Sequence, residues 1–566
     1  MIQLDIAIVG AGGAGMYAAL EAGKTNPSLK IGVLSKVFPT RSHTGSAQGG
    51  VNAVLKNVAE DDSIERHIYD TIKGSDFLAD QNAVKIMCQE APKIIYELEH
   101  LGASFSRLKD GRIAQRPFGG ASRPRTCYAA DRTGHVILQT LYEQCLRHQI
   151  TFFTEWFLLS LVHNGDSFVG LTALNIRSGD VVEIQAKAVI LATGGFSRIY
   201  WTRTSNALGN TGDGTAAAFR AGLLLKDMEF IQFHPTGLRR SGVLITEGAR
   251  GEGAYLLNKN NERFMENYAP ERKELAPRDL VSRAIETEIR EGRAFEERGE
   301  GYVHLDLTHL GGEIIKKRLP QIRDLSISFE GIDPIDDPIP VKPTAHYAMG
   351  GIHVDENGQT PILGIFAAGE SSCISVHGAN RLGGNSLLEI LVFGKRAGKS
   401  AAEYAAQTNY RAFPWTEKFS VEEEIKELLA GQGTERVSDL RTEMGQTMAE
   451  TVGIFRDKKQ LERGLSKIRE LQERLKRVKV TDRSRVFNTN LIETLELKNL
   501  LDLAEAVAVA AIHREESRGS HYRTDFRERD DKRFLCHQLV QKRTKGLFVA
   551  CMPVNTEAYS AEKRTY

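Results

Sequence analysis

The sequence predicts an α/β Rossmann-like domain that is discontinuous, with an inserted α+β capping domain, a C-terminal helical domain and a small terminal domain. Three observations predict this fold. An apolar run over residues 4–9 leads directly into a glycine-rich turn at 10–15, and a second run over 188–191 ends at Gly194 and Gly195. A third strand-and-glycine pattern returns at 364–370, after a long stretch of loops, short strands and charged helices. The first domain is therefore expected in two pieces.

The turn at 10–15 has the spacing of a dinucleotide-binding loop. Glycine permits the sharp turn from strand to helix and lets the backbone approach a pyrophosphate at the helix N-terminus. A small-residue helix over 14–22 and a strand over 31–34 follow, which is the context that this motif requires. Ser35 and Lys36 then stand where an acidic residue usually receives the ribose hydroxyls. This motif alone therefore leaves NADP open beside FAD.

The domain boundaries follow changes in sequence texture. We expect the dinucleotide-binding domain at 1–230 and 347–402, the capping domain at 231–346, the helical domain at 403–529 and the terminal domain at 530–566. Helices are expected over 215–221 and 279–290, and Asp213 either caps the first of them or binds a ribose or ribityl hydroxyl. Five apolar residues between Leu461 and Leu475 fall on one helical face, which indicates a packing seam.

Composition excludes several classes of protein. The 566 residues carry 74 Lys and Arg against 73 Asp and Glu, so the protein has no large net positive charge that would attract nucleic acid. The six cysteines form no CxxC pair, which argues against an iron–sulfur cluster or structural zinc in this chain. No run approaches the roughly eighteen apolar residues that span a bilayer, and the chain opens directly into a strand. We expect a cytoplasmic protein that reaches a membrane only through other subunits.

Three groups of loops carry the chemistry. They lie at 232–237 with 246–253, at 277–279, and at 344–351 with 377–386. Together they supply two histidines, several arginines and a threonine in glycine-flanked turns, the donors needed to hold a small dicarboxylate. Taken singly, each histidine could satisfy a loop carbonyl and each arginine a salt bridge. A metal site is disfavoured because neither HxxxH nor HExxH occurs.

These residues resemble the flavoprotein subunit of the succinate dehydrogenase and fumarate reductase family, from residue 5 to the end of the chain. The most specific markers are the segments at 41–44, 234–237, 246–248, 346–347 and 377–383. The resemblance implies FAD, covalently bonded through its 8α-methyl carbon to His43. It implies that the following residues line this cofactor: Gly10, Gly12, Gly13, Ala14, Gly15, Ser35, Lys36, Arg41, Ser42, His43, Thr44, Gln48, Gly49, Gly50, Asp213, Glu370, Ser386 and Leu387.

The resemblance also implies a reaction. His234, Thr246, His346 and Arg381 would hold the two carboxylates of succinate, with Phe118 either beside the substrate or simply in the core. A hydride would leave one methylene for the flavin while Arg278 takes a proton from the other. Glu247 and Arg250 would relay this proton towards solvent. Because arginine normally stays protonated, fumarate reduction is at least as easy to rationalise as succinate oxidation.

Partners and direction follow from the same resemblance. We expect an iron–sulfur subunit, membrane anchor subunits and quinone, with this chain on the cytoplasmic side of the membrane. The short stretch between Phe118 and Arg125 is closer to fumarate reductases, whereas Gln48 is typical of dehydrogenases, which we favour. The alternatives are an L-aspartate oxidase, whose flavin is not tethered through a histidine, an RNA-binding flavoprotein and a noncatalytic scaffold.

Overall fold

The computed structural model describes residues 1–564, so Thr565 and Tyr566 lie outside the described residues. Its central sheet has seven strands in the order β6-β2-β1-β9-β8-β7, with β17 paired to β9. Their bounds are β1 Ile2–Val9, β2 Ile31–Ser35, β6 Thr151–Thr154, β7 Trp156–His163, β8 Phe168–Asn175, β9 Asp180–Leu191 and β17 Ile365–Ala367. The strands expected at 4–9, 31–34, 188–191 and after Gly364 are thus neighbours, and β2, β1, β9 and β17 are parallel. Since parallel strands end at one edge, the glycine turns after β1 and β9 meet there.

The helices of the Rossmann-like domain are α1 (Gly13–Thr25), α2 (Ile64–Gly74), α3 (Gln81–His100), α4 (Thr133–Arg147), α5 (Asp213–Arg220) and α11 (Asn385–Gln407). Helices α1 and α11 pack directly on the sheet and α5 packs on β7, while α4 packs on α1 and α3 on α11. A short sheet of β3 (Val51–Asn52), β5 (Thr126–Cys127) and β4 (Gln115–Arg116) lies in the same part of the chain. Helix α11 packs along α1, because the glycines at 394 and 398 bring the two backbones close together.

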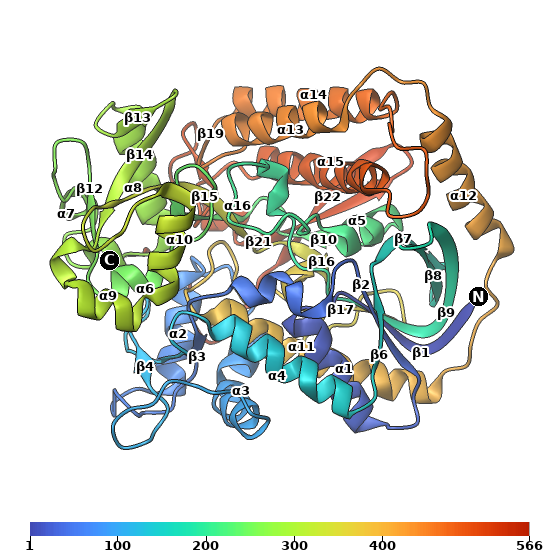
Figure 1. The fold of residues 1–566 in the computed structure, drawn as a ribbon, viewed down its shortest axis with the longest axis horizontal. Helices are drawn as coiled ribbons and strands as arrows, with labels where there is room; N and C mark the ends of the chain where they lie inside the picture. The colour runs from blue at the N-terminus through green and yellow to red at the C-terminus, as the bar shows by residue number, and fades with distance from the viewer. Residues whose placement is uncertain (565–566) are drawn as a thin grey trace.

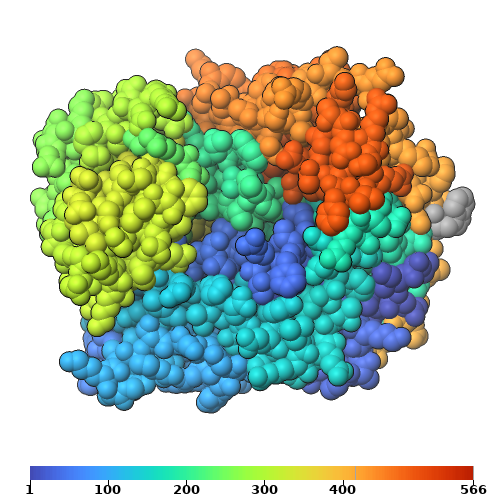
Figure 2. Space-filling view, viewed as in Figure 1, coloured from blue at the N-terminus to red at the C-terminus, as the bar shows by residue number. Residues whose placement is uncertain are grey.

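The capping domain has its own sheet and core, at the left of Figure 1. Its strands are β11 (Ile231–Leu238), β15 (Ile339–Ala348), β14 (Glu300–Asp306), β12 (Tyr255–Leu257) and β13 (Phe295–Glu297). Its helices are α6 (Glu247–Gly251), α7 (Met265–Tyr268), α8 (Arg278–Arg290), α9 (Gly312–Arg318) and α10 (Pro320–Glu330). A separate cluster of buried apolar residues, including Leu256, Ile285 and Val341, fills it. On the face shown in Figure 2, blue atoms from the N-terminal part of the chain lie in a hollow next to the yellow-green capping domain.

The C-terminal helices are α12 (Trp415–Ala430), α13 (Val437–Thr451), α14 (Lys458–Leu475) and α15 (Thr489–His513). The expected apolar seam lies on α14, where Leu461, Ile468 and Leu471 are fully buried and Leu465 and Leu475 pack beside them. This prediction is confirmed. None of the helices within residues 1–564 combines the length and apolarity needed to cross a membrane.

The last segment extends a second sheet. The hairpin of β21 (Cys536–Arg543) and β22 (Gly546–Pro553) follows the short helix α16 (Asp531–Phe534). It continues the strands β10 (Leu225–Lys226), β16 (Gly351–His353) and β18 (Ser372–Cys373), while β19 (Phe455–Arg456) pairs with β20 (Tyr522–Arg523). The segment therefore pairs with strands from far earlier in the chain.

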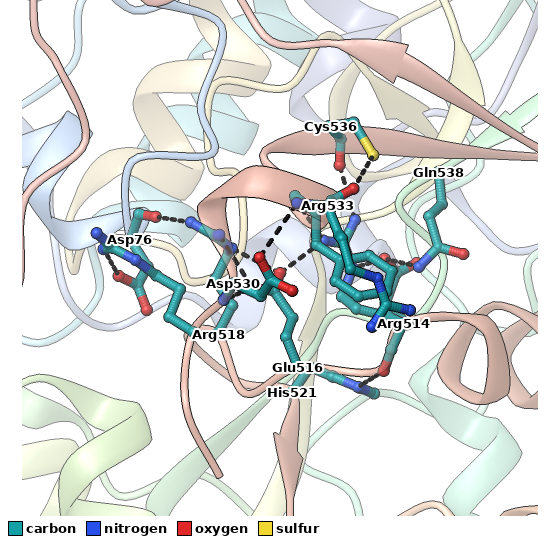
Figure 3. Close-up of polar contacts among 12 residues, drawn as sticks. Asp76, Arg514, Glu516, Arg518, His521, Asp530, Arg533, Cys536 and Gln538 are labelled. Carbon is teal, nitrogen blue, oxygen red and sulfur yellow. Dashed lines mark hydrogen bonds and ion pairs between the residues drawn. The ribbon is translucent and has the colours of Figure 1, made fainter. Parts of the chain in front are cut away.

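Buried ion pairs join the loop that follows α15 to the Rossmann-like domain (Figure 3). Arg514 donates to Glu229 at 2.5 Å and to Glu516 at 2.8 Å, and Arg518 donates to Glu516 at 2.7 Å. Arg518 also donates to the carbonyl oxygen of Asp76 at 3.1 Å. Because every one of these charges is buried and paired, removing a single partner would leave a costly unpaired charge.

Candidate functional site

A cavity of about 700 Å³ lies between the Rossmann-like domain and the capping domain. Most of the residues singled out in the sequence line it. They are Gly10, Gly12, Gly13, Ala14, Ser35, Lys36, Arg41, Ser42, His43, Thr44, Gln48, Gly49, Gly50, Phe118, Asp213, His234, Thr246, Glu247, Arg278, His346, Glu370, Arg381, Ser386 and Leu387. Gly15 and Arg250 do not line the cavity, and each lies behind a residue that does.

The glycine turn leaves room for a phosphate group. A Cβ at Gly10, whose φ is +111°, would lie 2.1 Å from the carbonyl oxygen of Ala192, and a Cβ at Gly15 would lie 1.9 Å from that of Gly10. These two glycines keep α1 against the sheet. A Cβ at Gly12 would meet only the Thr44 hydroxyl, at 3.3 Å, and this hydroxyl accepts from the backbone N–H of Gly13, the first residue of α1, at 3.0 Å. The backbone and helix dipole there fit a pyrophosphate.

The ammonium group of Lys36 is already paired. It donates to Thr211 and Asp213, both at 2.8 Å, and to Glu496 of α15 at 2.5 Å. Burial alone would lower the pKa of Lys36, but the charges of the two carboxylates outweigh this effect and raise it. Two carboxylates around one cation leave no free positive charge for a ribose phosphate. This arrangement favours FAD over NADP.

Asp213 does not cap helix α5. The N-cap is Gly212, and Asp213 is the first helical residue. Its carboxylate instead accepts hydrogen bonds from Lys36, from Thr211 at 2.8 Å and from Asn499 at 2.9 Å. The sequence could not reveal this arrangement because Asn499 is far along the chain.

His43 faces the cavity from the short turn η2 (His43–Ser46). Its Nδ1 accepts a hydrogen bond from the backbone N–H of Ala207 at 3.4 Å. Burial and the nearby charge of Arg198 lower the pKa of His43 to about 4. The imidazole is therefore neutral at neutral pH, and only a neutral ring has a nitrogen lone pair free to bond to carbon.

Two further imidazoles face each other, with ring centroids 5.1 Å apart, at His234 and His346. Nδ1 of His234 accepts from the backbone N–H of Thr236 at 3.2 Å, which places the ring proton on Nε2. This Nε2 is buried with no hydrogen-bond partner among residues 1–564. Nδ1 of His346 lies 2.7 Å from the hydroxyl of Ser205. Burial, reinforced by the charge of Arg278, holds the pKa of both rings well below the usual range.

Gln232 connects the two guanidinium groups of the cavity, a role that no motif around it predicts. Its Oε1 accepts from Arg278 at 3.1 Å and from Arg381 at 3.0 Å. Arg381 also lies over the ring of Tyr347, 4.4 Å from its centroid. Burial and the charge of Arg278 lower the pKa of Arg381 to about 9. The only sequence signal for Gln232 is that it stands two residues before His234.

A chain of charged groups leads from Arg278 away from the cavity. Nε of Arg278 donates to Glu247 at 2.7 Å, and Nη2 of Arg250 lies 3.9 Å from the same carboxylate oxygen. The backbone N–H of Gly119 donates to the other oxygen of Glu247 at 2.5 Å. Burial raises the pKa of Glu247, but the two guanidinium charges outweigh it and lower that pKa overall. Arg250 is buried and donates to the carbonyl oxygen of Glu274, so the chain continues within the capping domain, away from the cavity.

The charge of this region matches a dianion. Three guanidinium groups, of Arg278, Arg250 and Arg381, stand against the one carboxylate of Glu247, which leaves two positive charges beside two neutral imidazoles. Thr246 adds a hydroxyl, which accepts from the backbone N–H of Gly248 at 3.2 Å and keeps its own proton to donate.

Some lining residues carry no sequence signal. They are Arg198, the loop at 205–210, and the α10 residues Gln321, Leu325 and Phe329. Among the anticipated residues, Phe118 is only 4% exposed, so it belongs to the core and also borders the cavity. Burial raises the pKa of Glu370 to about 8, and its Oε1 lies 3.0 Å from the backbone N–H of Ala348. Glu370 is therefore mostly neutral near pH 7.

Known proteins match this chain over its full length. A model of the FAD binding domain matches residues 5–387, and a model of the fumarate reductase flavoprotein C-terminal region matches residues 441–566. The fumarate reductase flavoprotein subunit of Mycobacterium tuberculosis is 45% identical over 584 residues, covering 100% of this chain and 99% of the relative. The succinate dehydrogenase flavoprotein subunit of Coxiella burnetii is 48% identical over 572 residues, covering 98% and 96%.

The fold agrees with these matches. A chain of E. coli quinol fumarate reductase superposes with a TM-score of 0.96 at 43% sequence identity, covering 100% of this chain and 99% of that chain. It shares the FAD-binding Rossmann-like fold, the capping domain and the C-terminal helices. The protein is therefore a member of the succinate dehydrogenase and fumarate reductase flavoprotein family, an FAD-dependent oxidoreductase.

Proposed function

We propose that this protein oxidises succinate to fumarate as the flavoprotein subunit of a succinate:quinone oxidoreductase. The observation that carries the proposal is the charge of the site. Arg278 and Arg381 face the cavity beside two neutral imidazoles, and Arg250 lies behind them against Glu247, which leaves two net positive charges at this end; the other end of the cavity fits a dinucleotide. A four-carbon dianion is the substrate class that complements them.

The chain supplies the substrate contacts. Nε2–H of His234, the Thr246 hydroxyl, His346 and the guanidinium of Arg381 donate to the two carboxylates, and Phe118 borders the same space. Gln232 holds Arg278 and Arg381 in fixed relative positions. When bound, FAD supplies the acceptor for the hydride that succinate loses.

Arg278 handles the proton. Its side chain lines the cavity while Nε stays bonded to Glu247, so a proton taken from a methylene can pass on to Glu247 and towards Arg250. A proton that leaves this side chain has an acceptor already in place, because the Glu247 carboxylate lies 2.7 Å from Nε of Arg278. In the reverse direction the charged Arg278 donates the proton directly.

The second candidate is fumarate reduction by the same site. It is favoured by the charged Arg278, which can donate a proton directly, and by the short segment between Phe118 and Arg125. We place oxidation first because Gln48 is neutral. Its Nε2 donates to the carbonyl oxygen of Leu244 at 3.2 Å, whereas a carboxylate at this point of the cavity would oppose the addition of electrons to a bound flavin.

Activity in both directions tests the proposal. We expect faster succinate oxidation with an artificial acceptor than fumarate reduction with a reduced viologen. Arg278→Ala should keep its flavin and lose at least about a hundredfold in turnover both ways, because general acid–base catalysis is removed. The control is Arg290→Ala, which removes an exposed arginine at the far end of α8. Faster fumarate reduction would reverse the assignment of direction, and an active Arg278→Ala would remove this residue from its role.

We further propose that His43 bonds covalently to the 8α-methyl carbon of FAD. Acid-precipitated protein should retain its yellow colour, and His43→Ser should release FAD to the supernatant. The neutral state of His43 and its place on the cavity wall support this expectation. Complete loss of flavin from the unsubstituted protein would instead favour the L-aspartate oxidase alternative.

The partners belong to the same proposal. Among residues 1–564 no group of histidine, cysteine and acidic side chains is arranged to hold a metal, so electrons that leave the flavin need another carrier. We propose an iron–sulfur subunit in contact with this chain, and membrane anchor subunits that pass the electrons to quinone. The E. coli relative is described as a quinol fumarate reductase, which supports this assembly. We propose that this assembly holds the chain at the cytoplasmic side of the membrane.

A further inference from the structure

One buried carboxylate of the Rossmann-like domain binds a helix of the capping domain. Asp131 lies in the loop that precedes α4 and is fully buried. Its Oδ2 accepts from the backbone N–H groups of Gln321 at 2.7 Å and Ile322 at 3.3 Å. Both belong to the first turn of α10. The contact therefore joins two domains through a single side chain.

Helix α10 has no cap of its own. Its N-cap residue is Leu319, whose side chain makes no capping hydrogen bond, and Pro320 occupies the first turn. The first N–H groups of a helix carry partial positive charge and need an acceptor, which Ser, Thr, Asn or Asp usually supplies at the N-cap. Asp131 supplies this acceptor from the other domain. Burial raises the pKa of Asp131 although the two N–H groups oppose the shift, so its charged form depends on them.

Helix α10 forms one wall of the cavity, so its position determines where that wall lies. Gln321, Leu325 and Phe329 on this helix line the cavity, while Ile322 is fully buried in the core of the capping domain. Any movement of the N-terminus of α10 away from Asp131 would move this wall.

On its other side, Asp131 is fixed to the segment that bears His43. Helix α4 begins two residues later, and the backbone N–H of Gly134 donates to the carbonyl oxygen of Ala47 at 2.8 Å. A Cβ at Gly134 would lie 2.0 Å from the carbonyl oxygen of Thr44, so α4 touches the η2 backbone directly. Ala130 has a φ of +47°, an unfavourable conformation that persists only where the surroundings impose it.

We propose that Asp131 is a positioning residue that latches α10 of the capping domain to the turn carrying His43, and so holds the cavity closed around substrate. Asp131 itself does not line the cavity. This role can be tested through KM for succinate or fumarate, and it depends neither on the direction of the reaction nor on the role of Arg278.

Hydrogen exchange on the full-length, flavin-loaded protein tests this latch. Asp131→Ala should speed amide exchange in the first turn of α10 by about five- to tenfold, as expected for loss of a helix cap. The same opening should raise KM for succinate or fumarate by a similar factor and change kcat less. The matched control is Asp457→Ala, which removes a cap that accepts from Gln460 within the helical domain. It should speed exchange only in α14 and leave KM unchanged.

The exchange and KM measurements together support or overturn the role proposed for Asp131. Unchanged exchange in α10 overturns the proposal, and so does faster exchange in α10 with an unaltered KM, because the contact would then be only a local cap. If Asp131→Ala does not fold, Asp131→Asn replaces it. A neutral oxygen accepts roughly half as strongly as a carboxylate, so a smaller rise in both exchange and KM is expected, and wild-type values of both would overturn the proposal.

Discussion

At the scale of single residues, Gln232 shows how a neutral side chain can organise two charges. One oxygen accepts from both Arg278 and Arg381, while its amide nitrogen donates to Asn380 at 2.9 Å and to the carbonyl oxygen of Arg381 at 2.8 Å. All of these contacts are buried. The geometry of the two guanidinium groups therefore depends on one amide that does not itself line the cavity.

Gln232→Leu should lower kcat/KM by about tenfold or more, mainly through KM, because buried donors that lose their acceptor cost about 1–3 kcal/mol. Steady-state kinetics with succinate measures the change. Gln144→Leu is the control, since it removes another buried amide, bonded to the carbonyl oxygen of Leu101 far from the cavity. It should lower stability without altering KM. Equal effects of the two substitutions on KM would contradict the role given to Gln232.

The candidate site was predictable where its residues form local motifs. The glycine turn, the segment at 41–50 and the loops around His234, His346 and Arg381 each carry their own pattern, and all of them line one cavity. Gln232, Asp131 and the α10 residues have roles set by contacts with distant segments. No pattern within a short window of sequence could indicate them.

At the scale of elements, the contact between α1 and α11 determines where the glycine turn sits. A Cβ at Gly398 would lie 2.2 Å from the carbonyl oxygen of Ala18, and one at Gly394 would lie 2.7 Å from that of Ala14. Two glycines spaced by four residues therefore let the helix backbones approach closely. Helix α1 carries the turn at its N-terminus, so this packing positions the cofactor site.

Gly398→Ala should lower the free energy of unfolding by about 1–3 kcal/mol, because overpacking of the helix contact outweighs the better helix propensity of alanine. Thermal denaturation with and without added FAD measures it. In Gly23→Ala, the matched control on α1, the new Cβ would lie 3.4 Å from Ile150, an ordinary contact. This control should be as stable as the unsubstituted protein or more so. Equal stability of both variants would contradict the close packing.

The elements themselves were largely visible in the sequence. The strands expected at 4–9, 31–34 and 188–191 and the helix at 279–290 correspond to β1, β2, β9 and α8. The ends of β1, β2 and α8 shift by one or two residues, whereas β9 begins eight residues earlier than expected. Helix ends depend on capping contacts, and these can be made by distant residues, as at α10, whose first N–H groups bind Asp131. The pairing of the final hairpin with β10 could not be foreseen, because it depends on where the whole chain returns.

At the scale of the whole molecule, many titratable groups are buried away from water. Three histidines, His43, His67 and His353, have their pKa lowered to about 4, in each case mainly by burial and further by a nearby cation. These rings are neutral in the folded protein at pH 5, whereas in the unfolded chain a histidine titrates near its ordinary value of 6.5. Folding therefore opposes their protonation.

The stability of the protein should fall as the pH drops from about 6.5 towards 4. In this window the unfolded chain binds protons that the folded chain does not, so each such histidine lowers the free energy of unfolding by about 1.4 kcal/mol per pH unit. The thermal midpoint, measured across this range, should therefore decrease with acidity. His67→Gln removes one of these groups and should make the decrease shallower, whatever its effect on the midpoint at neutral pH. His148→Gln, at an exposed position, should leave the slope unchanged. A flat profile in the unsubstituted protein, or the same slope in His67→Gln, would contradict this account of the buried imidazoles.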